Sequence, residues 1–423
     1  MPQIMRNDDV SLQLNMHFPS HVIDLVRNIG DTVNSSGKEL FLVGGAVRDL
    51  LLNRANTDID LVIEGDAIAL ARRIAETMQA KLTVHTRFGT AKVHFSDFNF
   101  DIATARREIY RKPGALPTVQ PGTIRDDLYR RDFSINAMAV SLSPNNFGRL
   151  IDIYGGKDDV AYQVIRVLHP RSFIDDATRM LRACRYEQRL GFTMEKETAE
   201  LLRKNTMMLH TISGDRIRRE LDLTFKEEIP EHVLNRMANL DLLGLLHPSL
   251  KGNGWLANKY RAARQQAKQG NLSLLYLCLL VYSLEDKEIT QFTSFLNFPK
   301  NAEKAMVHTL QLKAKLPQLV YPSLKHSDIF ELLDGYVLAA IQANMIAAES
   351  KTTAENLELY LNKLRSIKTL LSGNDLINMG VRPGPQFTVV FKELHRAKLN
   401  GEVSTRKDEE NLASQLLDSL KKP

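Results

Sequence analysis

Hydrophobic and polar residues alternate with a period of two in the first part of the chain and with a helical period after it. The stretches "TDIDLVIEG" (57–65) and "AKVHFSDFNFDIATA" (91–105) alternate as strands do, and "AIALARRIAETMQ" (67–79) has the spacing of an amphipathic helix. From about residue 166 strand signals nearly vanish and long helical patterns such as 177–192 take over. The pattern predicts an α/β head followed by an all-helical remainder.

The first of these strands carries two carboxylates on one face. Asp58, Asp60 and Val62 fall on one side, and Ile59, Leu61 and Ile63 fall on the other. Ionised groups repel each other and are costly to bury without a partner, so a positive charge is expected there. Mg²⁺ is commonly bound through one or two carboxylates together with substrate phosphates, and two such ions assist in-line displacement at a phosphate. The alternative is that the pair caps or solvates an edge strand.

A third carboxylate follows on the next predicted strand. Asp101 shares a face with Asp97 and Asn99, whereas the phenylalanines and the isoleucine between and after them share the other. We expect Asp101 either to join the metal pair or to act as a base toward the attacking hydroxyl. Surface strands also place Asp on their wet face, and this alternative stays open.

A glycine pair precedes these carboxylates. In "FLVGGAVRDLLL" a strand runs through Gly44 and Gly45 into a helix that carries Arg48. Glycines allow backbone N–H groups and a helix N-terminus to approach a phosphate, and Arg48 could hold a triphosphate with its forked donors. A Gly-Gly turn alone is equally consistent with a structural role.

Composition limits the class of protein. The chain has 423 residues, 43% of them hydrophobic and 25% charged, which suits two or more globular domains. We expect no membrane span and no signal peptide, hence a cytoplasmic protein. Cys184 and Cys278 are expected to be packing residues, and the net charge of +6 fits a polyanionic partner without demonstrating one.

Four ordered motifs resemble a known family. "LVGGAVRD", "TDIDLVIEG", "RRDFSINAMA" and "IDDATRMLRACRYEQRLGF" are similar to the successive motifs of the class II (bacterial-type) tRNA nucleotidyltransferases and their poly(A) polymerase relatives, within the nucleotidyltransferase superfamily. The resemblance is densest over residues 39 to about 235. It implies that Asp58 and Asp60 hold Mg²⁺ and that Gly45 and Arg48 contact the triphosphate.

The third motif implies contacts to the incoming nucleotide. Arg131 and Asp132 match family positions that contact the nucleotide and its ribose, with Asn136 nearby. An Asp that accepts from the 2′-hydroxyl would favour ribonucleotides, because a buried acceptor is left unpaired when that hydroxyl is absent.

The fourth motif implies recognition of the base by protein side chains. The family's Glu-Asp-x-x-Arg reads "DDATR" here, so Asp176 and Arg179 take the roles of a template, and Arg182 and Arg185 follow on the same helix. Arg179 would donate to cytosine O2 and N3, and Asp176 would accept from the exocyclic amino group. Asp175 stands where the family has Glu. An ordinary capped amphipathic helix with an Asp175–Arg179 pair is the alternative.

The resemblance also implies a domain organisation. We expect an α+β protein with a nucleotidyltransferase (polymerase-beta-like) head followed by helical neck, body and tail domains. The segment between Asp101 and Arg131 has weak periodicity and matches the family's flexible loop, which helps the site change from CTP to ATP. The expected segments are an N-terminal helical segment (1–38), the head (39–165), the neck (166–235), the body (236–330) and the tRNA-binding tail (331–423).

These observations together predict an enzyme that adds C and A residues to the 3′ end of tRNA from CTP and ATP, with Mg²⁺ as cofactor. The expected partners are tRNA and the two nucleotides, with no membrane and no protein partner. The alternatives are an A-adding or CC-adding enzyme that performs part of this task, a poly(A) polymerase, and a noncatalytic RNA-binding protein with the same fold.

Overall fold

The structure is a computed structural model that describes residues 9–54, 58–86, 89–266, 270–380 and 384–420, with the side chains of Asp58 and Leu420 outside that description. The chain divides into two compact units. Unit 1 comprises Met1–Glu220 with Asn239–Leu245, and unit 2 comprises Leu221–Ala238 with Leu246–Pro423. The finer division into five segments stays a prediction.

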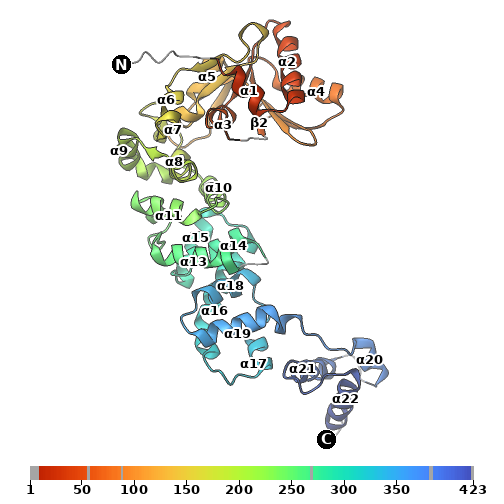
Figure 1. The fold of residues 1–423 in the computed structure, drawn as a ribbon. Helices are drawn as coiled ribbons and strands as arrows, with labels where there is room; N and C mark the ends of the chain where they lie inside the picture. The colour runs from red at the N-terminus through yellow and green to blue at the C-terminus, as the bar shows by residue number, and fades with distance from the viewer. Residues whose placement is uncertain (1–8, 55–57, 87–88, 267–269, 381–383, 421–423) are drawn as a thin grey trace. The chain divides into compact units, whose positions relative to one another are not determined.

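A seven-stranded sheet forms the centre of unit 1, and its strand β2 is labelled in Figure 1. The strands lie in the order β3-β4-β5-β2-β1-β8-β9. Its strands are β1 (Leu40–Val43), β2 (Asp58–Ile63), β3 (Lys81–His85), β4 (Thr90–His94), β5 (Asn99–Thr104), β8 (Met138–Ser141) and β9 (Leu150–Asp152). β2 and β5 pair in parallel, whereas the other neighbours pair antiparallel. The predicted strands at 57–65 and 91–105 are confirmed, and together with the helical remainder the sheet confirms the predicted α+β fold.

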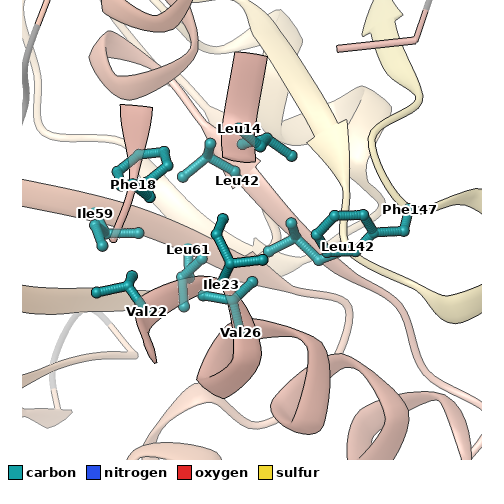
Figure 2. A pocket seen from close by; sticks show the side chains of 10 residues that line it. All are labelled: Leu14, Phe18, Val22, Ile23, Val26, Leu42, Ile59, Leu61, Leu142 and Phe147. Carbon is teal, nitrogen blue, oxygen red and sulfur yellow. The ribbon is translucent and has the colours of Figure 1, made fainter. Parts of the chain in front are cut away.

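One face of the sheet is apolar and covered by helices. Ile59 and Leu61 of β2 are buried there, as the alternation predicted. α1 (Ser11–His17) and α2 (Ser20–Asn34) supply the facing side chains. Figure 2 shows Leu14 of α1 and Ile23 of α2 close to the residues of β1 and β2. Burial of these aliphatic side chains contributes most of the favourable free energy that keeps the helices on the sheet.

The other face carries Asp60, one of the predicted site residues, beside a second core. Phe41, Val62 and Ala139 pack there against Leu128 of α5 (Ile124–Tyr129). Because side chains alternate along β2, Asp60 lies on this same face as Val62. The apolar packing on both sides therefore fixes the strand that presents Asp60.

The remaining elements of the first half are mostly helical, and the predicted helix at 67–79 is confirmed. They are α3 (Gly45–Leu51), α4 (Ala67–Met78), η2 (Ser134–Asn136), η3 (Pro144–Asn146), α6 (Gly156–Ala161), β10 (Val164–Ile165), α7 (Ser172–Asp175), α8 (Thr178–Leu190), β11 (Thr193–Met194), α9 (Lys196–Asn205), η4 (Thr206–Thr211), α10 (Gly214–Thr224), α11 (Pro230–Asn239) and α12 (Leu242–Leu246). α4 begins where it does because the Asp66 side chain accepts from the amides of Ile68 and Ala69.

The segment between Asp101 and Arg131 is more regular than its weak periodicity predicted. β6 (Arg106–Ile109) and β7 (Thr118–Pro121) form an antiparallel hairpin ahead of α5. Each strand has a single aliphatic residue, Ile109 or Val119, and both strands are at least partly exposed, so their sequence has little of the apolar alternation that marks a half-buried strand.

The rest of the chain consists of helices and connecting segments in the ranges that the structure describes. They are α13 (Gly254–Gln266), α14 (Leu272–Leu280), α15 (Asp286–Leu296), α16 (Lys300–Lys315), η5 (Leu316–Leu319), α17 (His326–Leu333), α18 (Leu338–Ala347), α19 (Lys351–Asn362), η6 (Leu364–Ser366), α20 (Gly373–Asn378), α21 (Pro385–Leu399) and α22 (Arg406–Leu420). The thiols of Cys184 and Cys278 are buried, as expected of packing residues.

Among the described residues, no single helix combines the length and apolar character that a membrane crossing requires. The bent pair α17 and α18 meets these criteria only when the two helices are taken together.

Candidate active site

Asp60, Asp101 and Lys92 form a row across three adjacent strands, which we call the sheet row. Asp60 is paired with Asp101 in the parallel register of β2 and β5, and Asp101 is paired with Lys92 in the antiparallel register of β5 and β4. Directly paired residues point to the same face. Lys92 Nζ donates to Asp101 Oδ2 at 2.9 Å. The predicted proximity of Asp60 and Asp101 is therefore present, with an ammonium group beside them.

Asp58 begins β2 in register with Asn99, but its side chain lies outside the described residues. Its role in holding metal stays a prediction. Within the described ranges, no group of three or more His, Cys, Asp or Glu side chains is arranged to hold a metal ion. The carboxylates of Asp60 and Asp101 are hard oxygen donors on adjacent, paired positions, and this chemistry fits Mg²⁺.

The glycine turn lies against the sheet row. Gly44, between β1 and α3, has a φ of 71°, which favours glycine. A Cβ atom at Gly44 would lie 2.6 Å from Arg131 Nη1 and 3.7 Å from Asp60 Oδ2. The turn therefore brings the backbone close to both a carboxylate and a guanidinium.

Arg48 of α3 is buried, with 6% of its surface exposed. Its Nη1 donates to Asn136 Oδ1 at 2.7 Å, while Nε and Nη2 donate to Asp49 Oδ1 at 2.9 and 2.8 Å. The forked donors are thus engaged within the protein. A contact of Arg48 with triphosphate stays a prediction, and it requires at least one of these bonds to be exchanged.

Asp132 is buried at the start of the third motif and is fully hydrogen-bonded. Its Oδ1 accepts from the amide of Phe133 and from Asn136 Nδ2, and its Oδ2 accepts from Arg182 Nε and Nη2 at 2.9 and 2.5 Å. Burial alone would raise the pKa of Asp132, but Arg182 and Asn136 outweigh it and lower the pKa to about 2. These bonds occupy the acceptor sites of the carboxylate. A ribose hydroxyl would have to replace one of them.

Arg131 is held by a buried carboxylate. Its Nε and Nη2 donate to Asp127 Oδ2, and Arg130 Nε donates to Oδ1 of the same carboxylate. Burial would raise the pKa of Asp127, but Arg131 and Arg130 outweigh it and lower the pKa below its usual value. The two arginines are therefore fixed by one anion before any nucleotide is present.

Asp176 and Arg179 are held at the junction of two helices. Asp176 follows α7 with an extended backbone and so precedes α8. Its Oδ1 accepts from the amide and hydroxyl of Thr178 and from Arg216 Nη2 at 2.7 Å. Arg179 donates from Nη2 to the carbonyl of Arg130 at 2.6 Å. Asp175 pairs with Arg171 at 3.2 Å.

Three guanidinium groups lie near the aromatic ring of Tyr186, which is part of α8. The guanidinium carbons of Arg48, Arg182 and Arg185 lie 5.6, 5.5 and 5.2 Å from the centre of its ring. Arg185 is buried and donates to Glu220 Oε2 at 3.0 Å. Arg185 therefore stabilises α8 against α10, and its predicted contact with nucleotide stays a prediction.

One cavity of about 380 Å³ brings most of these residues together. Its lining includes eight predicted residues, which are Gly45, Asp60, Arg131, Asp132, Asn136, Asp176, Arg179 and Arg182. The predicted residues Gly44, Arg48, Asp101 and Arg185 lie outside this lining. A volume of this size suits a nucleotide.

The lining also includes residues that the sequence did not single out, namely Glu108, Tyr110, Arg130, Thr178 and Tyr186. Tyr110 donates to Glu108 Oε2 at 2.7 Å, and burial and Glu108 raise its pKa. Both belong to the hairpin region, whose sequence gives little strand signal. Tyr186 follows Arg182 by four residues, so the two lie on the same face of a helix, and this spacing could have identified Tyr186 from the sequence.

Comparison with known proteins identifies the family. Residues 40–166 match the family described as the poly A polymerase head domain, and residues 191–252 match the probable RNA and SrmB-binding site of polymerase A. An A-adding tRNA nucleotidyltransferase of Geobacter sulfurreducens is 33% identical over 98% of this chain, which spans only 49% of that relative's length. The enzyme of the same description from Halalkalibacterium halodurans is 32% identical over 95% of this chain and 94% of its own.

Solved structures that resemble this chain point to the same family as these relatives. A CCA-adding enzyme in an apo form has a TM-score of 0.83 and 30% identity, with 97% of this chain and 99% of that chain covered. The Thermotoga maritima CCA-adding enzyme in complex with tRNA has a TM-score of 0.77 and 30% identity, with 98% and 99% covered. The resemblance of the four motifs is confirmed: this chain belongs to the family of class II tRNA nucleotidyltransferases, which are nucleotide-transferring enzymes.

Proposed function

We propose that the protein adds C and A residues to the 3′ end of tRNA, with CTP and ATP as the nucleotide donors. The observation that carries the proposal is the single cavity in which Asp60 lies with Asp132, Asp176 and Arg179. A carboxylate suited to hold a metal ion and a set of fixed polar groups suited to a nucleotide are thus combined in one site. The names of the relatives and of the solved structures support the same activity.

Base selection would depend on Asp176 and Arg179. Cytosine and adenine both present an exocyclic amino group next to a ring nitrogen acceptor, whereas uracil and guanine present a carbonyl in place of the amino group. An acceptor from Asp176 and donors from Arg179 suit the first pair and leave the second mismatched. Arg216 and Arg130 hold these two side chains in place, so little rearrangement is needed when a base enters.

The sugar and phosphates would lie between Asp132 and the glycine turn. Arg131 lies next to Gly44 and carries a charge that suits a phosphate. Asp60 and Asp58 are the residues that would hold Mg²⁺, with Asp101 next to them. When bound, the metal would lower the pKa of the attacking hydroxyl and neutralise charge on the phosphates.

The test is a series of tRNA substrates that end before C74, before C75 or before A76, each incubated with CTP or ATP alone. Addition of C to the shorter substrates and of A to the last one is the expected result. Extension beyond three nucleotides would instead indicate a poly(A) polymerase. No addition to any substrate, with tRNA still bound, would indicate a noncatalytic binding protein.

Addition of the terminal A alone is the second candidate. It is favoured by the two relatives named above. Both are described as A-adding enzymes, and both align with almost the whole of this chain. In the same series this candidate predicts that ATP is used on the substrate ending before A76 and that CTP is used on none.

A further inference from the structure

The sheet row contains a cation that the proposed chemistry does not use. Lys92 Nζ lies 2.9 Å from Asp101 Oδ2, and the two side chains are 30% and 41% exposed. Asp101 in turn lies in direct register with Asp60. The order across the sheet is therefore carboxylate, carboxylate, ammonium.

Electrostatics explains why this order is stable without metal. Two carboxylates in direct register on adjacent strands repel each other, and an ammonium against one of them offsets that repulsion. The same ammonium also fixes the direction of the Asp101 carboxylate, since Oδ2 is turned toward β4. Lys92 thus supplies, on one side of Asp101, positive charge that a divalent cation would supply on the other.

The neighbouring row on this face, formed by Lys81, His94 and Asn99, shows how Lys92 differs from a second lysine nearby. His94 lies within hydrogen-bonding distance of Thr83 and Asn99, both at 3.1 Å. Lys81 is paired with His94 across β3 and β4, and it is exposed. Because side chains alternate, Lys81 and Lys92 lie on the same face, but only Lys92 is in register with a carboxylate of the site.

We propose that Lys92 is a positioning residue that holds Asp101 in the sheet row and lowers the affinity of the site for a free divalent cation. The inference rests on the proposed function, in which that cation is bound beside Asp60. A like charge next to Asp101 opposes binding of the bare ion, and the partial exposure of Lys92 limits this effect to about three- to tenfold. A metal–nucleotide complex carries net negative charge, so the same lysine attracts it. Lys92 therefore favours entry of the metal together with the triphosphate.

The test measures binding of Mn²⁺ to the full chain by electron paramagnetic resonance, with and without CTP. The Lys92→Met protein is expected to bind free Mn²⁺ about three- to tenfold more tightly than wild type, and not to bind the Mn²⁺–CTP complex more tightly. Lys92→Arg keeps the charge and Lys81→Met removes an equal charge from the same face, so both should resemble wild type. Lys92→Gln repeats the test if the methionine variant does not fold.

Unchanged or weaker binding of free Mn²⁺ by Lys92→Met would overturn the inference, as would an equal effect of Lys81→Met. Asp60→Ala separates this failure from that of the proposed function. If Asp60→Ala binds Mn²⁺ as wild type does, the metal assignment is wrong and the role of Lys92 falls with it. If Asp60→Ala loses Mn²⁺ and wild type extends tRNA, a null result for Lys92→Met refutes only the role of the lysine.

Discussion

Two groups of residues at the candidate site are built by different means. The sheet row is set by strand register, and its members Lys92 and Asp101 are 30% and 41% exposed. The other group, which we call the arginine wall, consists of Arg131, Arg179 and Arg182 of the cavity lining. These side chains are held by partners such as Asp132, which is 50 residues from Arg182 in the sequence. The sheet row can therefore lose a side chain with little effect on the fold, whereas the arginine wall combines binding with stability.

Asp60→Ala gives the largest expected effect on activity and tests the sheet row. The substitution removes the carboxylate expected to hold metal, so nucleotide addition should fall by about 10³-fold or more. Binding of tRNA should stay nearly intact, because phosphate contacts elsewhere supply most of the affinity. Single-turnover extension and filter binding measure the two quantities.

Asp97→Ala is the matched control for this prediction. Asp97 precedes β5, its side chain is 52% exposed, and it lies 3.1 Å from His21. Extension by Asp97→Ala should equal that of wild type. Normal extension by Asp60→Ala would exclude the sheet row as the reacting site.

The sequence predicts the sheet row better than the arginine wall for a physical reason. Alternation along a strand places Asp60 opposite the buried Leu61, and the same rule places Asp101, so local pattern is sufficient. The pairing with Lys92 depends on the register between β4 and β5, which local pattern does not specify.

The arginine wall depends on contacts between distant parts of the chain. The motif resemblance identified Arg182 and Asp132, but it did not indicate that each is the partner of the other. Asp176 was expected on a helix and instead lies before α8, because its side chain accepts hydrogen bonds from Thr178. Such side-chain bonds compete with the helical backbone and are decided by the tertiary structure.

Arg182→Met gives the largest expected effect on stability. It leaves the Asp132 carboxylate buried with half of its hydrogen bonds missing, which should cost about 3 kcal/mol. Trp255 is the one tryptophan of the sequence and lies in unit 2, so its fluorescence follows that unit. In urea, circular dichroism should show an earlier transition for unit 1 while the fluorescence midpoint stays unchanged.

The double variant Arg182→Met with Asp132→Asn is the control for charge. It removes both charges of the pair, so it should recover part of the lost stability. A double variant less stable than Arg182→Met would show that the ion pair is not the source of the effect.

The same pair predicts a pH dependence of stability. The pKa of Asp132 is about 2 in the folded protein and 3.8 in its ordinary state, so its ionised form stabilises the fold above pH about 4. This contribution, about 2 kcal/mol, should be lost as the pH falls from about 4 toward 2. Urea unfolding of wild type and Asp132→Asn at several pH values gives the difference. A difference that does not shrink over this range would contradict the assignment.

Arg216→Met gives the smallest expected effect and tests whether Asp176 must be held by Arg216. Arg216 donates to Asp176 Oδ1 at 2.7 Å and to the carbonyl of Gly114 at 3.3 Å. Loss of one partly exposed, charge-assisted bond should raise the KM for the nucleotide by about three- to tenfold, because Asp176 is then less well held. Arg218→Met, which breaks a pair with Asp215 on the same helix, should leave KM unchanged. Equal effects of the two variants would mean that α10 as a whole, and not the contact with Asp176, supports the site.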